Sequence, residues 1–177
     1  MEHMPSIAID MDETIADPIK KVRELYYQDF GTRYSEEEMH GKSFSQVVPG
    51  HHKPKITEYL NRPGFFRDLD IFPDAQQVIE ALNKKYRVYI VSAAMEFPNS
   101  LLDKVQWLQE YLPFLNWKQY CLCGDKSVVQ TDFMIDDLTR NFVNFKGKAY
   151  LYHGHHNVHV EGYERVMDWA DVANKLL

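Results

Sequence analysis

Five short apolar runs, separated by amphipathic segments, restrict the fold of this chain more than any other feature. Runs that are apolar on almost every residue predict strands buried on both faces, as in a parallel sheet covered by helices. We therefore predict an α/β, Rossmann-like fold: a parallel sheet with helices on both faces and right-handed crossovers. The predicted strands are Ile7–Asp10, Val88–Ser92, Tyr120–Cys123, Phe133–Asp136 and Ala149–Tyr152.

Three of the segments that follow these runs carry helix signals. Asp74 precedes an apolar stripe at helical spacing that ends at Leu82. A second helix is predicted to begin at Asn99 or Ser100 and to stop before Pro113, and Asp168 can cap a last one. Strands and helices thus alternate along most of the chain, which supports the α/β prediction.

Residues 17–72 break this alternation, because they contain helical patterns and no predicted strand. A helical pattern there ends at Gly31, a capping box begins at Ser35, and Pro54 begins another helix. The stretch is longer than a simple crossover needs and shorter than an ordinary separate domain. We predict a small α-helical cap at 17–72, inserted after the first strand of a core formed by 1–16 and 73–177.

Charge and composition restrict the partners. The net charge is −6 and there is no long run of Lys or Arg, which argues against a nucleic acid polymer or an anionic membrane as partner. A small anionic substrate stays compatible, because one metal ion and a lysine can reverse the local field. No export signal or long apolar segment is present, and Cys121 and Cys123 are interpreted as reduced thiols. The sequence thus predicts a cytoplasmic protein.

The strongest chemical signal is an apolar strand that ends in Asp10, with Asp12 two residues later. Ligands of open α/β sheets bind at the carboxyl ends of the strands, so both acids are expected at the functional edge. Two acids placed there repel each other unless a cation binds or one is protonated, and both conditions are useful in catalysis. An Asp-rich turn or an acidic helix cap could have the same sequence, so the motif alone does not distinguish a catalytic site from a structural element.

Four further residues make the pattern more specific. A second apolar strand ends in Asp136 and Asp137, and with Asp10 these acids can build an all-oxygen site suited to Mg²⁺. Ser92 closes the second predicted strand and can hold a phosphoryl oxygen. Lys126, ten residues before Asp136, can neutralise charge between a nucleophile and a transferred phosphoryl group. A strand-end serine or a loop lysine is unremarkable by itself, so the prediction depends on the set.

In order and spacing, these residues resemble the four motifs of the haloacid dehalogenase superfamily of phosphohydrolases. More closely, nearly the whole chain resembles the 5′(3′)-deoxyribonucleotidases. That finer likeness is carried by Asp10-Met11-Asp12 with Ala16-Asp17, Pro63-Gly64-Phe65-Phe66 with Leu69 and Pro73, Asp125-Lys126-Ser127-Val128-Val129, Ile135-Asp136-Asp137, His156-Asn157 and Trp169-Ala170-Asp171.

The resemblance implies a Mg²⁺-dependent phosphatase that hydrolyses the 5′- or 3′-phosphate of a (deoxy)nucleoside monophosphate through an aspartyl-phosphate. Asp10 would be the nucleophile and Asp12 the general acid and base. Ser92 and Lys126 would bind the phosphate. The implied Mg²⁺ ligands are Asp10, the backbone carbonyl of Asp12, and Asp136, with Asp137 in support.

Several positions depart from the family pattern. Glu13 and Thr14 stand where relatives often have a glycine and an aliphatic residue, and Gly124 stands where some relatives have a basic one. These changes leave the predicted phosphoryl-transfer residues in place and bear on the nucleotide preference. Phe44 is our candidate for packing on the base, and a role in the cap core explains it equally well.

Other functions stay open at this point. A phosphatase of the same superfamily could act on a sugar phosphate or another small phosphate monoester, and a homodimer is not excluded. A phospho-accepting receiver module uses similar residues, but it needs a lone acceptor Asp on its third strand. A histidine-rich segment invites a zinc hypothesis, yet it lacks carboxylate or cysteine partners at a familiar zinc spacing, so a polar loop is favoured; its members are His153, His155, His156 and His159, with His51 and His52 elsewhere.

Overall fold

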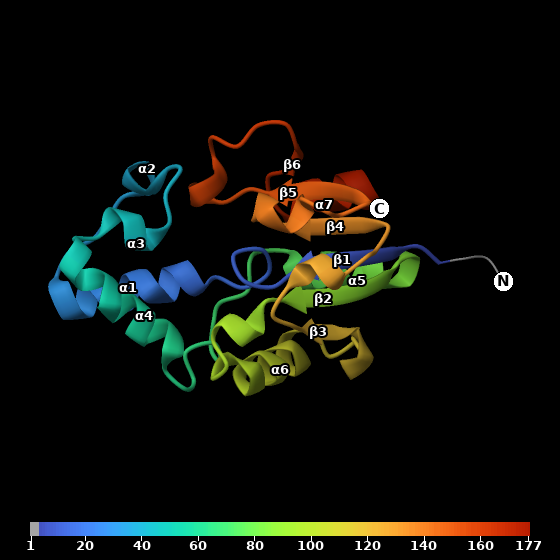
Figure 1. Ribbon diagram of the computed structural model, residues 1–177. Coiled ribbons are helices and arrows are strands. Elements are labelled where there is room, and N and C mark those ends of the chain that lie inside the picture. The colour runs from blue at the N-terminus through green and yellow to red at the C-terminus, as the bar shows by residue number, and fades with distance from the viewer. Residues whose placement is uncertain (1–3) are drawn as a thin grey trace.

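A six-stranded, fully parallel sheet forms the centre of the protein, in the strand order β3-β2-β1-β4-β5-β6 (Figure 1). The computed structural model describes residues 4–177, so the first three residues of the predicted core segment lie outside it. All five predicted strands are confirmed. The strands are β1 (Ser6–Asp10), β2 (Arg87–Ser92), β3 (Tyr120–Leu122), β4 (Phe133–Asp136), β5 (Lys148–Tyr152) and β6 (Glu164–Val166).

Sequence analysis did not predict β6. It has only three residues, and two of them, Glu164 and Arg165, are charged. The strand forms because its backbone pairs in register with β5, with Leu151 opposite Arg165. An edge strand of this kind is specified by its neighbour in the sheet and gives no apolar signal of its own.

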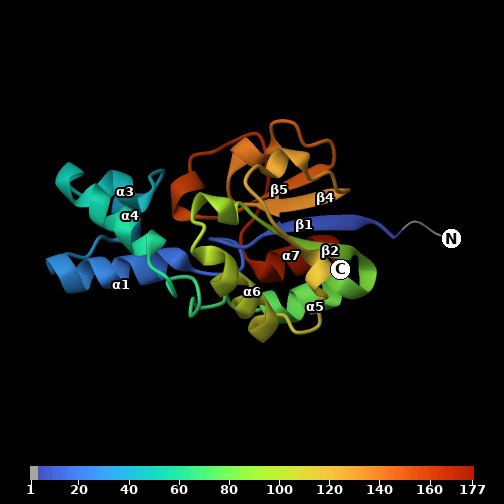
Figure 2. The same ribbon diagram turned by 60° about the horizontal axis from the view of Figure 1, so that its bottom comes forward.

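Helices cover both faces of the sheet, as expected, but unequally. The α-helices α5 (Ala75–Lys85), α6 (Ser100–Tyr111) and α7 (Trp169–Leu176) pack on one face (Figure 2). Their apolar stripes bury Trp107 and Trp169 against the strands. The other face carries a smaller apolar cluster, which includes Phe142 of a short 3-10 helix. The 3-10 helices are η1 (Gly50–His52), η2 (Ala94–Glu96), η3 (Trp117–Gln119), η4 (Lys126–Val128), η5 (Thr139–Phe142) and η6 (His155–Asn157).

A helical cap lies beyond the carboxyl ends of the strands (Figure 1). It consists of α1 (Pro18–Phe30), α2 (Glu36–Met39), α3 (Phe44–Val47) and α4 (Lys53–Asn61), with η1 before α4. The local signals work as expected: α1 ends at Gly31 in the left-handed region, and the capping box of Ser35 and Glu38 begins α2. Tyr26 and Tyr59 fill the interior of the cap.

The chain enters and leaves the cap through two adjacent extended segments. The backbone N–H of Asp17 donates to the carbonyl of Asp70 at 2.9 Å, and that of Phe72 donates to the carbonyl of Ile15 at 2.8 Å. These hydrogen bonds hold the cap over the edge of the sheet where β1 and β4 end. No helix within residues 4–177 has the length and apolarity needed to cross a membrane.

Candidate active site

Asp10 and Asp136 end the two central strands of the sheet. β1 and β4 pair in parallel with Ile9 opposite Ile135, so the next residue of each strand, Asp10 and Asp136, emerges at the same edge. With Asp137 they form a group of buried carboxylates whose oxygens lie within 4.8 Å of one another. The structure therefore brings together carboxylates from two distant parts of the chain, as predicted.

Lys126 lies between these carboxylates. Its Nζ is 2.5 Å from Oδ1 of Asp10 and 2.8 Å from Oδ2 of Asp136. The lysine begins the 3-10 helix η4, and Asp125 caps that turn by accepting a hydrogen bond from the backbone N–H of Ser127. Its position is thus fixed by the local fold as well as by the charges it meets.

Burial makes this group of charges sensitive to any cation nearby. Loss of solvent raises the pKa of both Asp10 and Asp136, and the Lys126 ammonium counteracts that rise. For Lys126 itself, burial favours the neutral amine, but the two carboxylates raise its pKa overall. The carboxylates repel one another as well, so a further positive charge would be stabilised here.

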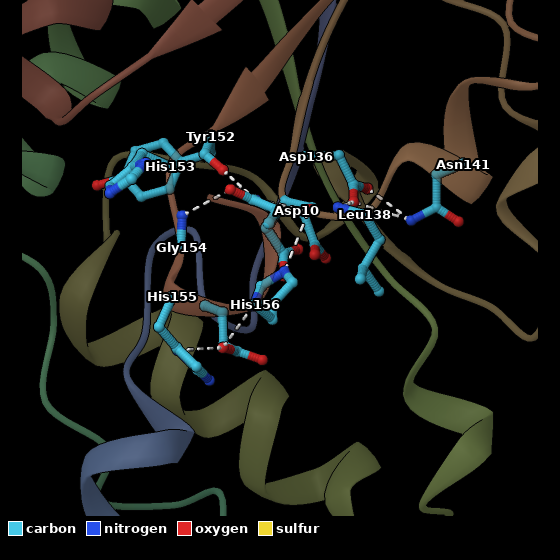
Figure 3. Close-up of polar contacts among 12 residues, drawn as sticks. Asp10, Asp136, Leu138, Asn141, Tyr152, His153, Gly154, His155 and His156 are labelled. Atoms are coloured by element: carbon cyan, nitrogen blue, oxygen red, sulfur yellow. Dashed lines mark hydrogen bonds and ion pairs between the residues drawn. The ribbon is translucent and has the colours of Figure 1, made fainter. Parts of the chain in front are cut away.

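The orientation of each carboxylate is fixed by neighbouring donors. Oδ1 of Asp10 accepts from the backbone N–H of Met11 at 2.7 Å. Asp136 accepts from the backbone N–H of Leu138 and from the side-chain amide of Asn141, both at 2.9 Å (Figure 3). Such donors pre-orient acids that must hold a metal or meet a reacting atom.

The donor set fits a divalent cation. Three carboxylates supply hard oxygen atoms, and Oδ1 of Asp137 is buried with no hydrogen-bond partner among the described residues. A buried oxygen without a donor is costly unless a cation satisfies it. The site can therefore hold a divalent metal ion.

Asp12 is held by a lysine that sequence analysis missed. Lys104 of α6 is almost fully buried; its Nζ forms an ion pair with Oδ2 of Asp12 and donates to the hydroxyl of Ser92 at 2.9 Å. A signal existed, because Lys104 stands three residues after Leu101 and four before Leu108, and this spacing puts it on one face of the predicted helix with these two leucines. A lysine on a buried stripe requires a partner, and here that partner is Asp12.

The hydroxyl of Ser92 is turned toward Asp12. Its Oγ donates to Oδ2 of Asp12 at 3.3 Å, and the side chain is fully buried at the end of β2. The predicted role of Ser92 in binding the phosphate stays a prediction. The predicted role of the Asp12 backbone carbonyl as a metal ligand likewise stays a prediction.

A pocket between the cap and the sheet opens onto this group. Asp10, Asp12, Lys126 and Asp137 contribute charge at one end, and the cap side is apolar. Phe44 lines the pocket and also packs edge-on against Tyr26, with ring centroids 5.4 Å apart, so both interpretations of this residue stand. The apolar lining consists of Pro18, Ile19, Val22, Phe44, Ile56, Leu60, Phe66, Ala93, Phe97 and Leu138.

His156 and Asn157, which belong to the family resemblance, both contact Asp137. Asn157 is buried, and its amide donates to the carbonyls of Asp137 at 2.9 Å and Tyr152 at 2.8 Å. His156 Nε2 lies 3.0 Å from Oδ2 of Asp137. Although burial disfavours the imidazolium, the carboxylates of Asp137 and Glu13 raise the pKa of His156 to about 10.

An α/β sheet with a cap inserted after its first strand, and acids ending two adjacent central strands, defines the class of haloacid dehalogenase-like phosphohydrolases. Solved structures agree on the fold. A protein of Burkholderia xenovorans, provisionally named a haloacid dehalogenase-like hydrolase, matches with a TM-score of 0.58 at 14% identity, covering 97% of this chain and 96% of that one. YfnB of Bacillus subtilis, provisionally named a hydrolase of this class and described as bound to magnesium, matches with a TM-score of 0.60 at 12% identity, covering 99% of each chain.

The family is more specific than this class. The model of the "5′ nucleotidase, deoxy (Pyrimidine), cytosolic type C" family matches residues 4–177. The chain belongs to this family and is a phosphomonoester hydrolase, which answers the receiver alternative. The predicted resemblance to the deoxyribonucleotidases is thus confirmed.

Two relatives in bacteria are named 5′(3′)-deoxyribonucleotidases. A protein of Staphylococcus epidermidis, provisionally named a 5′(3′)-deoxyribonucleotidase, is 39% identical over 168 residues, which is 95% of this chain and 93% of the relative. The 5′(3′)-deoxyribonucleotidase of Bacillus subtilis strain 168 is 40% identical over 112 residues, 63% of this chain and 65% of the relative.

Proposed function

We propose that this protein hydrolyses the 5′- or 3′-phosphate of a deoxynucleoside monophosphate, with Mg²⁺ as cofactor and an aspartyl-phosphate on Asp10 as intermediate. The observation that carries the proposal is the position of Lys126, within 2.8 Å of oxygens of both Asp10 and Asp136 at the end of an apolar pocket. A phosphate placed there would meet a carboxylate nucleophile and an ammonium on one side.

In the first step, an oxygen of Asp10 attacks phosphorus in line with the ester oxygen. The new bond joins the Asp10 carboxylate to phosphorus, the ester bond breaks, and the nucleoside leaves. Asp12 donates a proton to the departing oxygen, so the nucleoside leaves as a neutral alcohol. Because Lys104 and Ser92 both contact Oδ2 of Asp12, the carboxyl is held at one orientation for this transfer.

In the second step, water attacks the phosphorus of the acyl phosphate. Asp12, now a carboxylate, accepts a proton from the water, the bond between Asp10 and phosphorus breaks, and inorganic phosphate is released. Lys126 and Ser92 would bind the phosphoryl oxygens. Mg²⁺ would be held by Asp10, the Asp12 carbonyl and Asp136 with support from Asp137, and it would neutralise charge on the phosphoryl oxygens.

The cap supplies what a nucleoside needs. The helices of residues 17–72, which we propose as the cap domain, present an apolar lining that would cover a base and exclude water from the acyl phosphate. Phe44 is proposed to contact the base. We also propose that the enzyme works in the cytoplasm, where Cys121 and Cys123, free in this structure, would stay reduced.

A substrate panel tests the proposal. Phosphate release would be measured from 5′- and 3′-deoxynucleoside monophosphates, ribonucleotides and sugar phosphates, with Mg²⁺ and with a chelator. We expect the highest kcat/KM for a deoxynucleotide and no activity with the chelator. A clear preference for a sugar phosphate would overturn the substrate claim. Asp10→Asn should fold normally and lose several orders of magnitude in turnover, and retained activity would remove Asp10 as the nucleophile.

A further inference from the structure

A second group of potential metal ligands lies beside the catalytic carboxylates and has no part in the proposed reaction. Glu13 of the loop after β1 meets His155 and His156 of η6, which follows β5, and each offers a ligand atom within 4.8 Å of the others. Figure 3 shows the side chains of His155 and His156 close together, on the loop that passes near Asp10. The group is defined here as the Glu13–His155–His156 cluster.

Each histidine of the cluster has one buried nitrogen atom without a normal hydrogen-bond partner among the described residues. Oε1 of Glu13 lies 3.3 Å from Nδ1 of His156 and 3.7 Å from Nδ1 of His155. Nδ1 of His156 and Nε2 of His155 are buried and have no hydrogen-bond partner within residues 4–177. An unsatisfied buried polar atom is costly. Nδ1 of His156 is such an atom and lies beside the Glu13 carboxylate, so a cation bound between the two would satisfy both. The nitrogen of His155 that faces Glu13 is Nδ1, and its unsatisfied Nε2 lies on the other side of the ring.

The second nitrogen of His156 has the arrangement of a metal-binding histidine. Nε2 lies 3.0 Å from Oδ2 of Asp137 and 3.2 Å from the Asp137 carbonyl. Histidines that bind a metal through one nitrogen commonly donate the other N–H to a carboxylate, which fixes the ring and its tautomer. Bound at Nδ1, a metal would displace only the proton carried there and would leave the contact with Asp137 in place.

We propose that Glu13, His155 and His156 form a second metal site, which takes a transition-metal dication of the Zn²⁺ type. Two imidazole nitrogens with one carboxylate are a typical zinc donor set that keeps a fourth position open. The cluster differs in this from the all-oxygen group of Asp10, Asp136 and Asp137, which suits a harder cation. The two sites therefore select different ions.

The fold provides both access and a link to the catalytic site. Glu13 and His155 line a second cavity, which Asp17 and His153 also line, and Glu13 lines the substrate pocket as well. Asp137 contacts His156 and belongs to the catalytic carboxylates. An ion in the cluster would thus fix the orientation of one supporting acid of the catalytic metal site.

The sequence favoured a polar loop because no carboxylate stands at zinc spacing near the histidines. The missing carboxylate comes from Glu13, which departs from the family pattern and whose backbone has a positive φ of 56°. Only the fold places it against η6, because β1 and β5 lie on either side of β4.

Metal binding tests this site independently of activity. Co²⁺, used as a spectroscopic substitute for Zn²⁺, would be titrated into the whole protein with Mg²⁺ in large excess, followed by visible absorption and calorimetry. We expect one equivalent of Co²⁺ with the intense visible bands of low-coordinate nitrogen ligation, and competition by Zn²⁺. His155→Ala and, separately, Glu13→Gln should weaken binding at least tenfold.

Two controls make the result specific. His51→Ala removes an exposed cap histidine and should leave Co²⁺ binding unchanged. Asp136→Asn disables the proposed catalytic site and should leave Co²⁺ binding within about twofold, so failure of one site is distinguished from failure of the other. The proposal is overturned if no equivalent binds in excess Mg²⁺, or if Glu13→Gln, which keeps the size of the side chain, binds Co²⁺ like the wild type.

Discussion

Lys104 and Asp12 stand 92 residues apart in the chain and form an ion pair at the base of the pocket, where the lysine side chain is 1% exposed. The pair joins the loop after β1 to the buried face of α6, and Ser92 at the end of β2 completes it. The carboxylate proposed to transfer the proton is thereby held by two elements of the core, α6 and β2. Residues 17–72 also reach this lysine, because the centroid of the Phe66 ring lies 4.5 Å from its Nζ.

Replacing Lys104 by Met should therefore impair catalysis more than substrate binding. The variant keeps an apolar stem of similar length but leaves Asp12 and Ser92 without their shared donor. We expect kcat to fall by about two orders of magnitude, the scale of one lost general acid–base contribution, with KM changed less than threefold. Steady-state kinetics on a deoxynucleotide measure both. Lys84→Met, which removes an exposed lysine of α5, is the matched control, and an equal loss in the two variants would exclude a positioning role for Lys104.

The position of Lys126 leads to a second prediction, which concerns stability and not catalysis. Replacing it by Met leaves the buried carboxylates of Asp10 and Asp136 facing each other without a cation. We expect the free energy of unfolding in a chelator to fall by about 3 to 5 kcal/mol, the usual cost of breaking a buried ion pair.

Added Mg²⁺ should stabilise the Lys126→Met variant more than the wild type, because the ion would supply the missing positive charge. Urea unfolding with and without Mg²⁺ measures this difference. Lys148→Met, which removes an exposed partner of Glu164, serves as control. An identical response to Mg²⁺ in all three proteins would argue against a metal site at these carboxylates.

The strands and the acids at their ends were predictable because both depend on local sequence. β1 and β4 are apolar on nearly every residue, and parallel pairing then puts Asp10 and Asp136 at one edge whatever else the chain does. The helical character of residues 17–72 could be predicted for the same reason, because helix caps are local signals in the sequence.

The remaining parts of the site depend on contacts between distant segments. Lys104 was hidden because a lysine among the apolar residues of a predicted helix looks like an exposed residue until its partner is known. Leu102 of the same helix is apolar and yet 66% exposed. β6 forms only because β5 offers an edge. Glu13 lies near His156 because of the order of the strands in the sheet, and the spacing of apolar residues along the sequence does not reveal that order.

The pH dependence of stability should reveal His155. Burial lowers the pKa of its imidazole to about 4, and the neighbouring charges of His156 and Arg23 act in the same direction. In the unfolded chain the pKa is about 6.5. Between these two pH values the unfolded state binds a proton at His155 that the folded state does not bind. The free energy of unfolding therefore decreases as the pH falls from about 6.5 toward 4.

His155→Gln removes this titration. We expect the free energy of unfolding of the wild type, measured in urea with a chelator present, to decline more steeply than that of the variant between pH 7 and 4.5. Above pH 7 the difference between the two proteins should be constant. Parallel curves over the acid range would show that the His155 ring is not held in its neutral form.

Phe44 can be assigned by comparing substrates with and without a base. Its ring lines the pocket and packs on Tyr26, so loss of the ring affects both binding and the cap. If the ring stacks on a base, Phe44→Leu should raise KM for a deoxynucleoside monophosphate about tenfold, within the range of about 1 to 3 kcal/mol for base–aromatic stacking. Deoxyribose 5-phosphate, which has no base, should keep its KM. Phe142→Leu, in the core on the far face of the sheet, controls for general loss of stability, and an equal change for both substrates would assign Phe44 to the cap core alone.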